Sequence, residues 1–331
     1  GYNRDKEKLP QINMGMYYGE ESGLPLYYRV YPGSISDKTH LKYMVADNEF
    51  INGKHTRFVM DRGFYSKENL QYLTQGGYRF VIALPGSLKY CQELVETHSA
   101  ELINHSEFRL GAGLPYGKSY ESTVLGFRMN IHLYYDPEKA LRETIALYEL
   151  LEAQENDLKL MEEPPEKKLH YERFFHINRS KDGKLGFVRN FQAIDAALKA
   201  CGFFLIAETD FKKTTAEILD IYRRRDTLEK SFDDLKNELD KKRLRIHTSD
   251  TAQGKVFVSF LSLIVRSYLL KRLKDYMQKN GLTLRKILLE LDKIKTIQYP
   301  GSEDERLLNP LTKQQREIYE LLELPMPECR G

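Results

Sequence analysis

The chain has 331 residues, of which 30% are charged and 41% are hydrophobic, and its formal net charge is +3. This composition excludes wholesale disorder and a membrane class, and the length predicts a core fold with a large insertion or two to three domains. The longest apolar run, Val256 to Val265, is too short to span a bilayer, and the N-terminus lacks the apolar region of a signal peptide. Three widely spaced cysteines fit a reducing cytoplasm.

Charge is distributed unevenly along the chain. The segment from Ser87 to Glu166 holds 15 acidic and 7 basic residues, whereas Lys255 to Lys286 holds 8 basic and 1 acidic. The first segment therefore disfavours contact with phosphate and the second could provide it. Core packing alone also explains the apolar residues of the basic segment. This segment is therefore interpreted either as a packed core helix or as a helix that also contacts phosphate.

The first 86 residues predict alternating strands and helices. The expected elements are strands at Ile12 to Tyr18 and Pro25 to Tyr31, a helix at Asp37 to Glu49, a strand at Arg57 to Met60, a helix at Lys67 to Leu73 with Ser66 as N-cap, and a strand at Arg79 to Leu84. This order indicates a mixed sheet with helices packed on it, and therefore an α/β or α+β core.

Residues 87 to about 200 differ in composition and are interpreted as an insertion. The remaining expected elements are β-like stretches near Ser119 to Tyr135, an acidic helix at Pro137 to Met161, a buried strand at Phe203 to Ala207, a long helix at Thr214 to Lys242, a helix at Val256 to Met277, and short helices around Leu284 to Ile294 and Lys313 to Leu322. The predicted division is core residues 1–86, insertion 87–201, core residues 202–275 and a helical tail 276–331.

Four side chains of the long charged helix fall on one stripe. Tyr222, Arg225, Glu229 and Lys236 lie at offsets of 0, 3, 7 and 14 residues. At roughly 100° per residue they fall within about 60° of one another, over about 21 Å of helix. A stripe with a phenol, two cations and one carboxylate suits a nucleic-acid backbone with a divalent cation. The alternative is a solvated helix in which Arg225 pairs with Glu229.

Asp61 is the second candidate in the first part of the chain. It lies between a short β-prone run and Gly63, where an aspartate is often a cap or a turn former. The alternative is an acidic ligand at a strand end.

The spacing Tyr-x2-Arg-x3-Glu-x6-Lys matches in full the signature of the IS-four-like group of DDE transposases from bacterial insertion sequences. Five other segments are similar, in order, to the catalytic core of that family. They are Gly1 to Asp5, Leu9 to Gly15, Gly23 to Leu26, Pro32 to Asp37 and Phe58 to Gly63. The resemblance covers nearly the whole chain. A minor departure is Gly254-Lys255, where members often have Gly-His.

The resemblance implies an RNase H-like α/β fold, interrupted by a β-rich insertion before the last catalytic helix. It implies that Asp61 and Glu229 are catalytic carboxylates that bind metal. It also implies that Tyr222, Arg225 and Lys236 bind the DNA phosphates of the transposon end. The expected cofactors are two Mg²⁺ or Mn²⁺ ions, about 3.5 to 4 Å apart in such sites.

The family's chemistry needs a third carboxylate, which similar proteins carry on the first strand of the fold. The resemblance places that aspartate upstream of Gly1, so the chain as given is expected to be inactive. Asp5 matches the loop after the first strand and not the strand, so it is not the expected substitute.

The function implied is cut-and-paste transposition, with double-stranded DNA as partner, a homodimer on DNA and a place in the bacterial cytoplasm at the nucleoid. Two other functions stay open, a non-catalytic DNA-binding remnant of a transposase and an RNase H-like nuclease. The sequence contains no Cys/His spacing suited to zinc, no Gly-rich phosphate loop and no Gly-x-Ser-x-Gly elbow.

Overall fold

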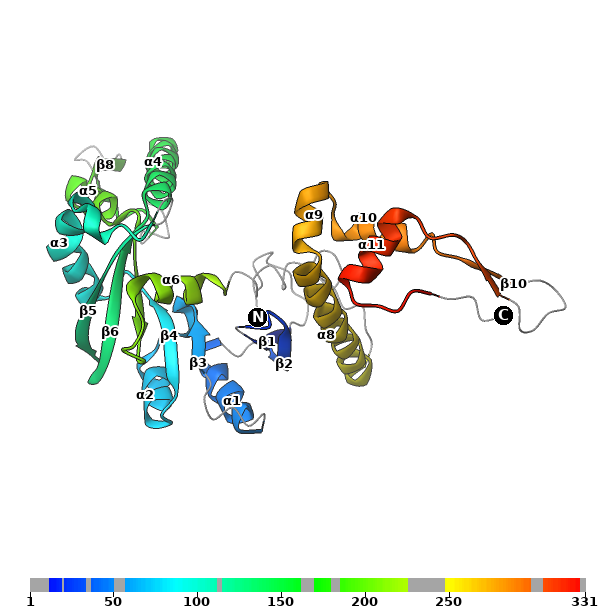
Figure 1. The fold of residues 1–331 in the computed structure, drawn as a ribbon. Helices are drawn as coiled ribbons and strands as arrows, with labels where there is room; N and C mark the ends of the chain where they lie inside the picture. Colours follow the sequence, from blue (N-terminus) through cyan, green and yellow to red (C-terminus); the bar gives the residue numbers. More distant parts are fainter. Residues whose placement is uncertain are drawn as a thin grey trace. The chain divides into compact units, whose positions relative to one another are not determined.

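The computed structural model describes residues 12–19, 21–33, 37–50, 57–111, 115–161, 170–179, 185–225, 248–298 and 306–327 (Figure 1). The chain divides into two compact units. The first, here called the core unit, is Ile35–Arg223, and the second unit combines Gly1–Ser34 with Arg224–Gly331. Glu229 and Lys236 lie outside the described residues.

The core unit is built on a five-stranded mixed sheet. In spatial order its strands are β3 (Arg57–Met60), β4 (Arg79–Leu84), β9 (Phe203–Glu208), β6 (Phe127–Tyr135) and β5 (Tyr116–Val124). The pair β3 and β4 is parallel, and the other pairs are antiparallel. The predicted mixed sheet with flanking helices is confirmed.

Helices connect and flank the strands of the core unit. They are α1 (Asp37–Phe50), α2 (Lys67–Gln75), α3 (Lys89–Asn104) and α6 (Thr215–Arg223), with short 3-10 helices η1 (Arg62–Phe64) and η2 (Ser106–Phe108). The predicted cap of α2 is present, because the Ser66 hydroxyl accepts a 3.1 Å hydrogen bond from the Asn69 N–H. α3 was missed in sequence reasoning, and its N-cap residue Leu88 makes no side-chain capping bond that could have marked its start.

The sheet and α6 enclose an apolar cluster. Its buried members are Val81, Tyr134, Ile206, Ile218, Leu219 and Ile221. Each fully buried side chain of this size contributes roughly 1.5 to 3 kcal/mol relative to exposure. The strands and α6 are therefore held to each other mainly by this cluster.

A second layer of the core unit lies around the long acidic helix. It comprises α4 (Pro137–Leu160), β7 (Phe175–Arg179), β8 (Leu185–Arg189) and α5 (Phe191–Ala200), and their apolar side chains share a separate cluster. α4 starts after Asp136, whose side chain accepts from the Glu138 and Lys139 N–H groups. β5 and β6 lie within the predicted insertion 87–201 and pair into the main sheet through β9. The boundaries of that insertion stay a prediction.

The second unit begins with an antiparallel hairpin, and one long helix packs on it. The hairpin strands are β1 (Ile12–Tyr18) and β2 (Pro25–Pro32), and the helix is α8 (Ser249–Arg272), whose Phe260 and Leu263 contact the hairpin side chains. α8 begins seven residues before the predicted start. Thr248 is its N-cap, because the Thr248 hydroxyl accepts a hydrogen bond from the Thr251 N–H.

Shorter elements complete the second unit. They are α9 (Lys274–Asn280), α10 (Leu284–Leu291), β10 (Thr296–Gln298), β11 (Arg306–Leu308) and α11 (Lys313–Leu321). Leu273, Leu284, Ile287, Ile318 and Leu322 form its buried apolar cluster.

Among the described ranges, one stretch, Asp250–Arg272, is long and apolar enough to cross a membrane by length and composition alone. Core helices of soluble proteins meet the same two criteria.

Candidate catalytic site

Asp61 lies at the carboxyl ends of the parallel strands β3 and β4. In α/β sheets this is the end where ligands usually bind. The Asp61 side chain is half-buried, and its Oδ1 accepts a 2.7 Å hydrogen bond from the Gly63 N–H. Asp61 is thus the N-cap of η1, as the simpler sequence interpretation expected. A cap bond of this kind also orients the carboxylate, so it is compatible with a role as a ligand.

Gly63 leaves room for the Asp61 carboxylate. A Cβ added at Gly63 would lie 2.9 Å from Asp61 Oδ1, closer than real Cβ contacts occur. Because the atom it meets is the end of a side chain, the carboxylate would move and the backbone would not need to. The orientation of Asp61 therefore depends on glycine two residues later.

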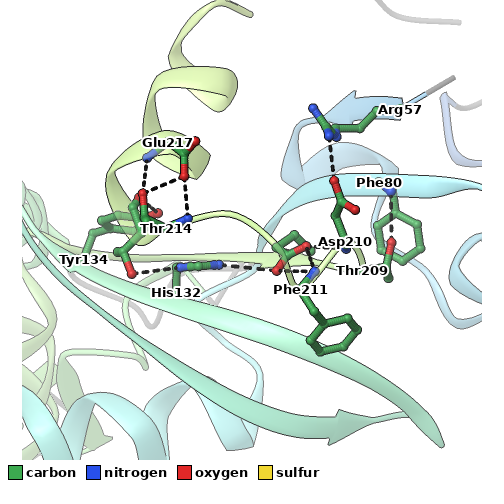
Figure 2. Close-up of polar contacts among 11 residues, drawn as sticks. Arg57, Phe80, His132, Tyr134, Thr209, Asp210, Phe211, Thr214 and Glu217 are labelled. Carbon is green, nitrogen blue, oxygen red and sulfur yellow. Dashed lines mark hydrogen bonds and ion pairs between the residues drawn. The ribbon is translucent and has the colours of Figure 1, made fainter. Parts of the chain in front are cut away.

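The other end of β3 carries an arginine and aspartate cluster. Asp210 is almost fully buried and accepts a 2.7 Å hydrogen bond from Arg57 Nη2 (Figure 2). Arg79 Nη1 lies 3.5 Å from the other oxygen of the same carboxylate. Arg57 and Arg79 are the first residues of β3 and β4, so this ion pair joins the strand starts to the segment after β9.

Glu208, the last residue of β9, is fully buried beside a fully buried histidine. Its carboxylate accepts hydrogen bonds from the N–H groups of Asp210 and Phe211, the latter at 3.0 Å (Figure 2). His132 Nε2 lies 3.8 Å from Glu208 Oε1. Burial alone raises the pKa of Glu208, but His132, the two N–H groups and Asn130 outweigh burial and lower the pKa.

The same network continues to the first turn of α6. His132 Nδ1 hydrogen bonds with Thr215 Oγ1 at 3.2 Å, and the Tyr134 hydroxyl donates to the Thr215 carbonyl at 2.8 Å (Figure 2). Glu217 accepts from both the N–H and the hydroxyl of Thr214. The start of α6 is therefore bonded to the β6 strand by two side chains and capped by a third.

α6 ends earlier than the sequence predicted. Tyr222 lies in its last turn and packs against the apolar cluster of the sheet, and Arg223 Nη2 lies 3.8 Å from Asp136. Arg224 and Arg225 form a turn, so the single helix predicted from Thr214 to Lys242 is wrong at this point. The packing of α6 on the sheet is described up to Tyr222, and residues 226–247 lie outside the described residues.

The predicted site residues are thus placed in different parts of the chain. Asp61 and Tyr222 belong to the core unit, and the partly buried Arg225 belongs to the second unit. Because Glu229 and Lys236 lie outside the described residues, the predicted stripe stays a prediction. The roles predicted for Asp61, Tyr222 and Arg225, and for the two residues outside the described ranges, stay predictions.

The described residues contain no group of three or more His, Cys, Asp or Glu side chains that could hold a metal ion. Sequence reasoning missed Glu208, His132 and Asp210. One signal was available, since Glu208 closes the otherwise apolar strand Phe203–Glu208. A carboxylate inside such a strand must find hydrogen-bond donors when it is buried.

Comparison with known proteins agrees with the fold. The model of the transposase DDE domain matches residues 1–265, which is most of the chain. No curated protein matches. The mixed α/β sheet with flanking helices is consistent with the RNase H-like fold of this family. The chain belongs to the family of transposases with a DDE domain.

Proposed function

We propose that this protein is a DNA transposase that cleaves DNA at the ends of an insertion sequence and joins those ends to target DNA. The observation that supports it most is the family match over residues 1–265. Family membership implies a phosphodiester-transfer activity and DNA binding. The IS-four-like assignment rests on the Tyr-x2-Arg-x3-Glu-x6-Lys spacing in the sequence.

Asp61 and Glu229 are the proposed catalytic carboxylates and metal ligands. Asp61 suits this role, because a half-exposed carboxylate at the carboxyl end of a sheet offers the hard oxygen donors that Mg²⁺ and Mn²⁺ prefer. Bound ions would activate the attacking oxygen and stabilise the leaving one. Glu229 is assigned from the sequence spacing alone.

Tyr222, Arg225 and Lys236 are the proposed contacts to the DNA backbone. Arginine and lysine neutralise phosphate charge, and a tyrosine hydroxyl donates to phosphate oxygens. Tyr222 is only partly buried, so it retains surface for such a contact.

The proposed chemistry has two steps. A water oxygen forms a bond to the phosphorus at the element's end while the bond from phosphorus to the 3′ oxygen breaks, and that oxygen takes a proton to become a 3′-hydroxyl. The hydroxyl then attacks a phosphorus of target DNA and displaces another 3′ oxygen. Because two ends must be joined, we infer a homodimer on DNA at the bacterial nucleoid.

The test is Mn²⁺-dependent cleavage of a duplex that carries the element's own end. It is run on the 331-residue chain and on a version extended upstream of Gly1, where the resemblance places the third carboxylate. We expect cleavage by the extended protein, and Glu229→Ala abolishes it. Asp195→Asn is the matched control, because Asp195 is an exposed carboxylate on α5 and should leave cleavage unchanged.

Other outcomes identify the competing functions. Salt-dependent DNA binding by both versions without any cleavage would indicate a non-catalytic remnant and would remove the catalytic role of the carboxylates. Cleavage without preference for the element's end, and without products in which that end is joined to target DNA, would indicate a nuclease.

A further inference from the structure

The end of β9 carries a buried polar network that cannot touch DNA. Glu208 and His132 are both fully buried, so neither side chain can contact a substrate. Buried polar groups are costly unless they are hydrogen-bonded. Here the Glu208 carboxylate accepts from two backbone N–H groups and His132 Nδ1 bonds with Thr215, whereas His132 Nε2 makes no hydrogen bond within the described residues and lies 3.8 Å from Glu208. Any effect of this pair on catalysis must therefore act through the backbone that it holds.

The backbone held by Glu208 is the connection from β9 to α6. Its carboxylate accepts from the N–H groups of Asp210 and Phe211. Phe211 has a φ of 53°, a left-handed conformation that is unfavourable for a bulky residue. Such a conformation persists only when its surroundings determine it, and the hydrogen bonds that the Asp210 and Phe211 N–H groups donate to Glu208 provide that constraint.

His132 links the buried carboxylate to α6 itself. One ring nitrogen lies 3.8 Å from Glu208 and the other hydrogen bonds with Thr215 Oγ1, the first residue of α6 (Figure 2). Tyr134, two residues along β6 from His132, hydrogen bonds to the Thr215 carbonyl. The chain Glu208–His132–Thr215 therefore joins two strands to the start of one helix.

α6 transmits this constraint towards Tyr222, one of the predicted DNA contacts. Tyr222 is seven residues beyond Thr215, about 10 Å along the axis of an α-helix. The apolar side chains of α6 hold it against the sheet, but such contacts are non-directional. The hydrogen bonds at Thr215 are directional. They can therefore fix the position of α6 along the helix axis.

We propose that Glu208 and His132 are positioning residues that fix α6, and through it Tyr222. The proposal rests on the proposed transposase function for its catalytic consequence. Displacements of about 1 Å far from the reacting atoms can lower a rate by about 10²-fold, so the effect should be measurable as a rate.

The experiment compares three single variants with the unmodified protein. Glu208→Gln keeps the shape of the buried side chain and removes its charge. Thr215→Val keeps Glu208 and His132 and cuts their link to α6, which covers the case in which Glu208→Gln does not fold. Glu217→Gln is the matched control, because Glu217 caps the same helix from an exposed position.

The first readout is amide hydrogen exchange of residues 209–223, which needs no DNA and no metal. We expect exchange throughout α6 to be at least about tenfold faster in Glu208→Gln and Thr215→Val, with β6 unchanged and Glu217→Gln faster only at Thr214. Faster exchange that stops at Phe211 in Glu208→Gln, or an unchanged α6 in Thr215→Val, would overturn the proposal.

The second readout separates positioning from folding. In the upstream-extended protein, single-turnover cleavage by Glu208→Gln should fall about tenfold or more, while the Kd for the element's end stays within about twofold. An equal fall in Glu217→Gln, or a wild-type rate in the folded Glu208→Gln protein, would contradict a positioning role. If the unmodified protein does not cleave, the proposed function fails and hydrogen exchange alone decides this proposal.

Discussion

The two ends of β3 use carboxylates in different ways. At the carboxyl end, Asp61 is half-buried and its orientation comes from a hydrogen bond with a glycine N–H two residues later. At the other end, Asp210 is almost fully buried between two arginines, and nearby Glu208 is fully buried beside His132. Polar groups that are buried and bonded serve the fold, whereas a carboxylate that keeps its exposure can still meet a ligand. This contrast separates a candidate catalytic carboxylate from structural ones.

Asp61→Asn should give the largest functional effect. Removing one member of a catalytic set typically lowers a rate by about 10⁴-fold, and we expect a loss of that order in Mn²⁺-dependent cleavage by the upstream-extended protein. Stability should change by less than about 1 kcal/mol, because the amide oxygen can still accept from the Gly63 N–H. Thermal unfolding and a cleavage assay measure the two quantities on one sample. If the folded Asp61→Asn protein cleaves at the wild-type rate, Asp61 is not a catalytic residue.

Glu208→Ala should give the largest loss of stability. Removing one partner of a buried pair costs about 3 to 5 kcal/mol, and it also leaves the Asp210 and Phe211 N–H groups without their acceptor. A unit of the size of the core unit loses about 2 to 4 °C of Tm per kcal/mol, so we expect its transition to fall by on the order of 10 °C. Glu121→Ala is the control, because Glu121 is an exposed carboxylate that also pairs with one cationic residue. Equal effects of the two changes would mean that burial of Glu208 is not important.

The pH dependence of stability provides a second check on Glu208. Its pKa in the folded protein is lowered from 4.5. Its contribution to stability is therefore fully present above pH 4.5 and is lost as the pH falls through the lower folded value. Glu208→Gln should flatten the fall in Tm over that acid range. An unchanged acid profile would contradict the cause assigned to the lowered pKa.

Gly63→Ala should affect activity more than stability. The new Cβ would lie 2.9 Å from Asp61 Oδ1, and the carboxylate can move aside. We expect cleavage to fall by about tenfold through misplacement of that oxygen, with a change in the free energy of unfolding of less than about 1 kcal/mol. Gly126→Ala does not serve as a control, since Gly126 has a φ of 88°. Gly86→Ala does, because its Cβ would meet nothing within 4 Å.

Periodicity and capping residues were sufficient to predict two neighbouring strands of the main sheet, one of them at its edge. The ranges Arg57–Met60 and Arg79–Leu84 were predicted with their observed bounds, because each is a short apolar run between turn residues. β7, β8 and α5 were missed, since strands of five residues and a helix of ten carry a weak local pattern and depend on their shared cluster.

Sequence predicts a site residue only where its neighbours in the chain reveal its role. Asp61 was found because a strand and a glycine turn surround it. Glu208 and His132 were not, because 76 positions along the chain separate two residues that only the pairing of β6 with β9 brings together.

Arg128→Ala should give the smallest effect and tests how the Phe211 turn is held. Arg128 lies 5.2 Å from the centre of the Phe211 ring and forms an ion pair with Glu121, and both charged side chains are exposed. Exposed ion pairs and exposed cation–π contacts are each worth at most about 1 kcal/mol. We therefore expect a loss of about 1 kcal/mol in urea unfolding, with the Phe211 amide still protected from exchange. Loss of that protection would show that the turn is held from the surface by Arg128. Retained protection would show that the hydrogen bonds accepted by Glu208 hold it from the interior.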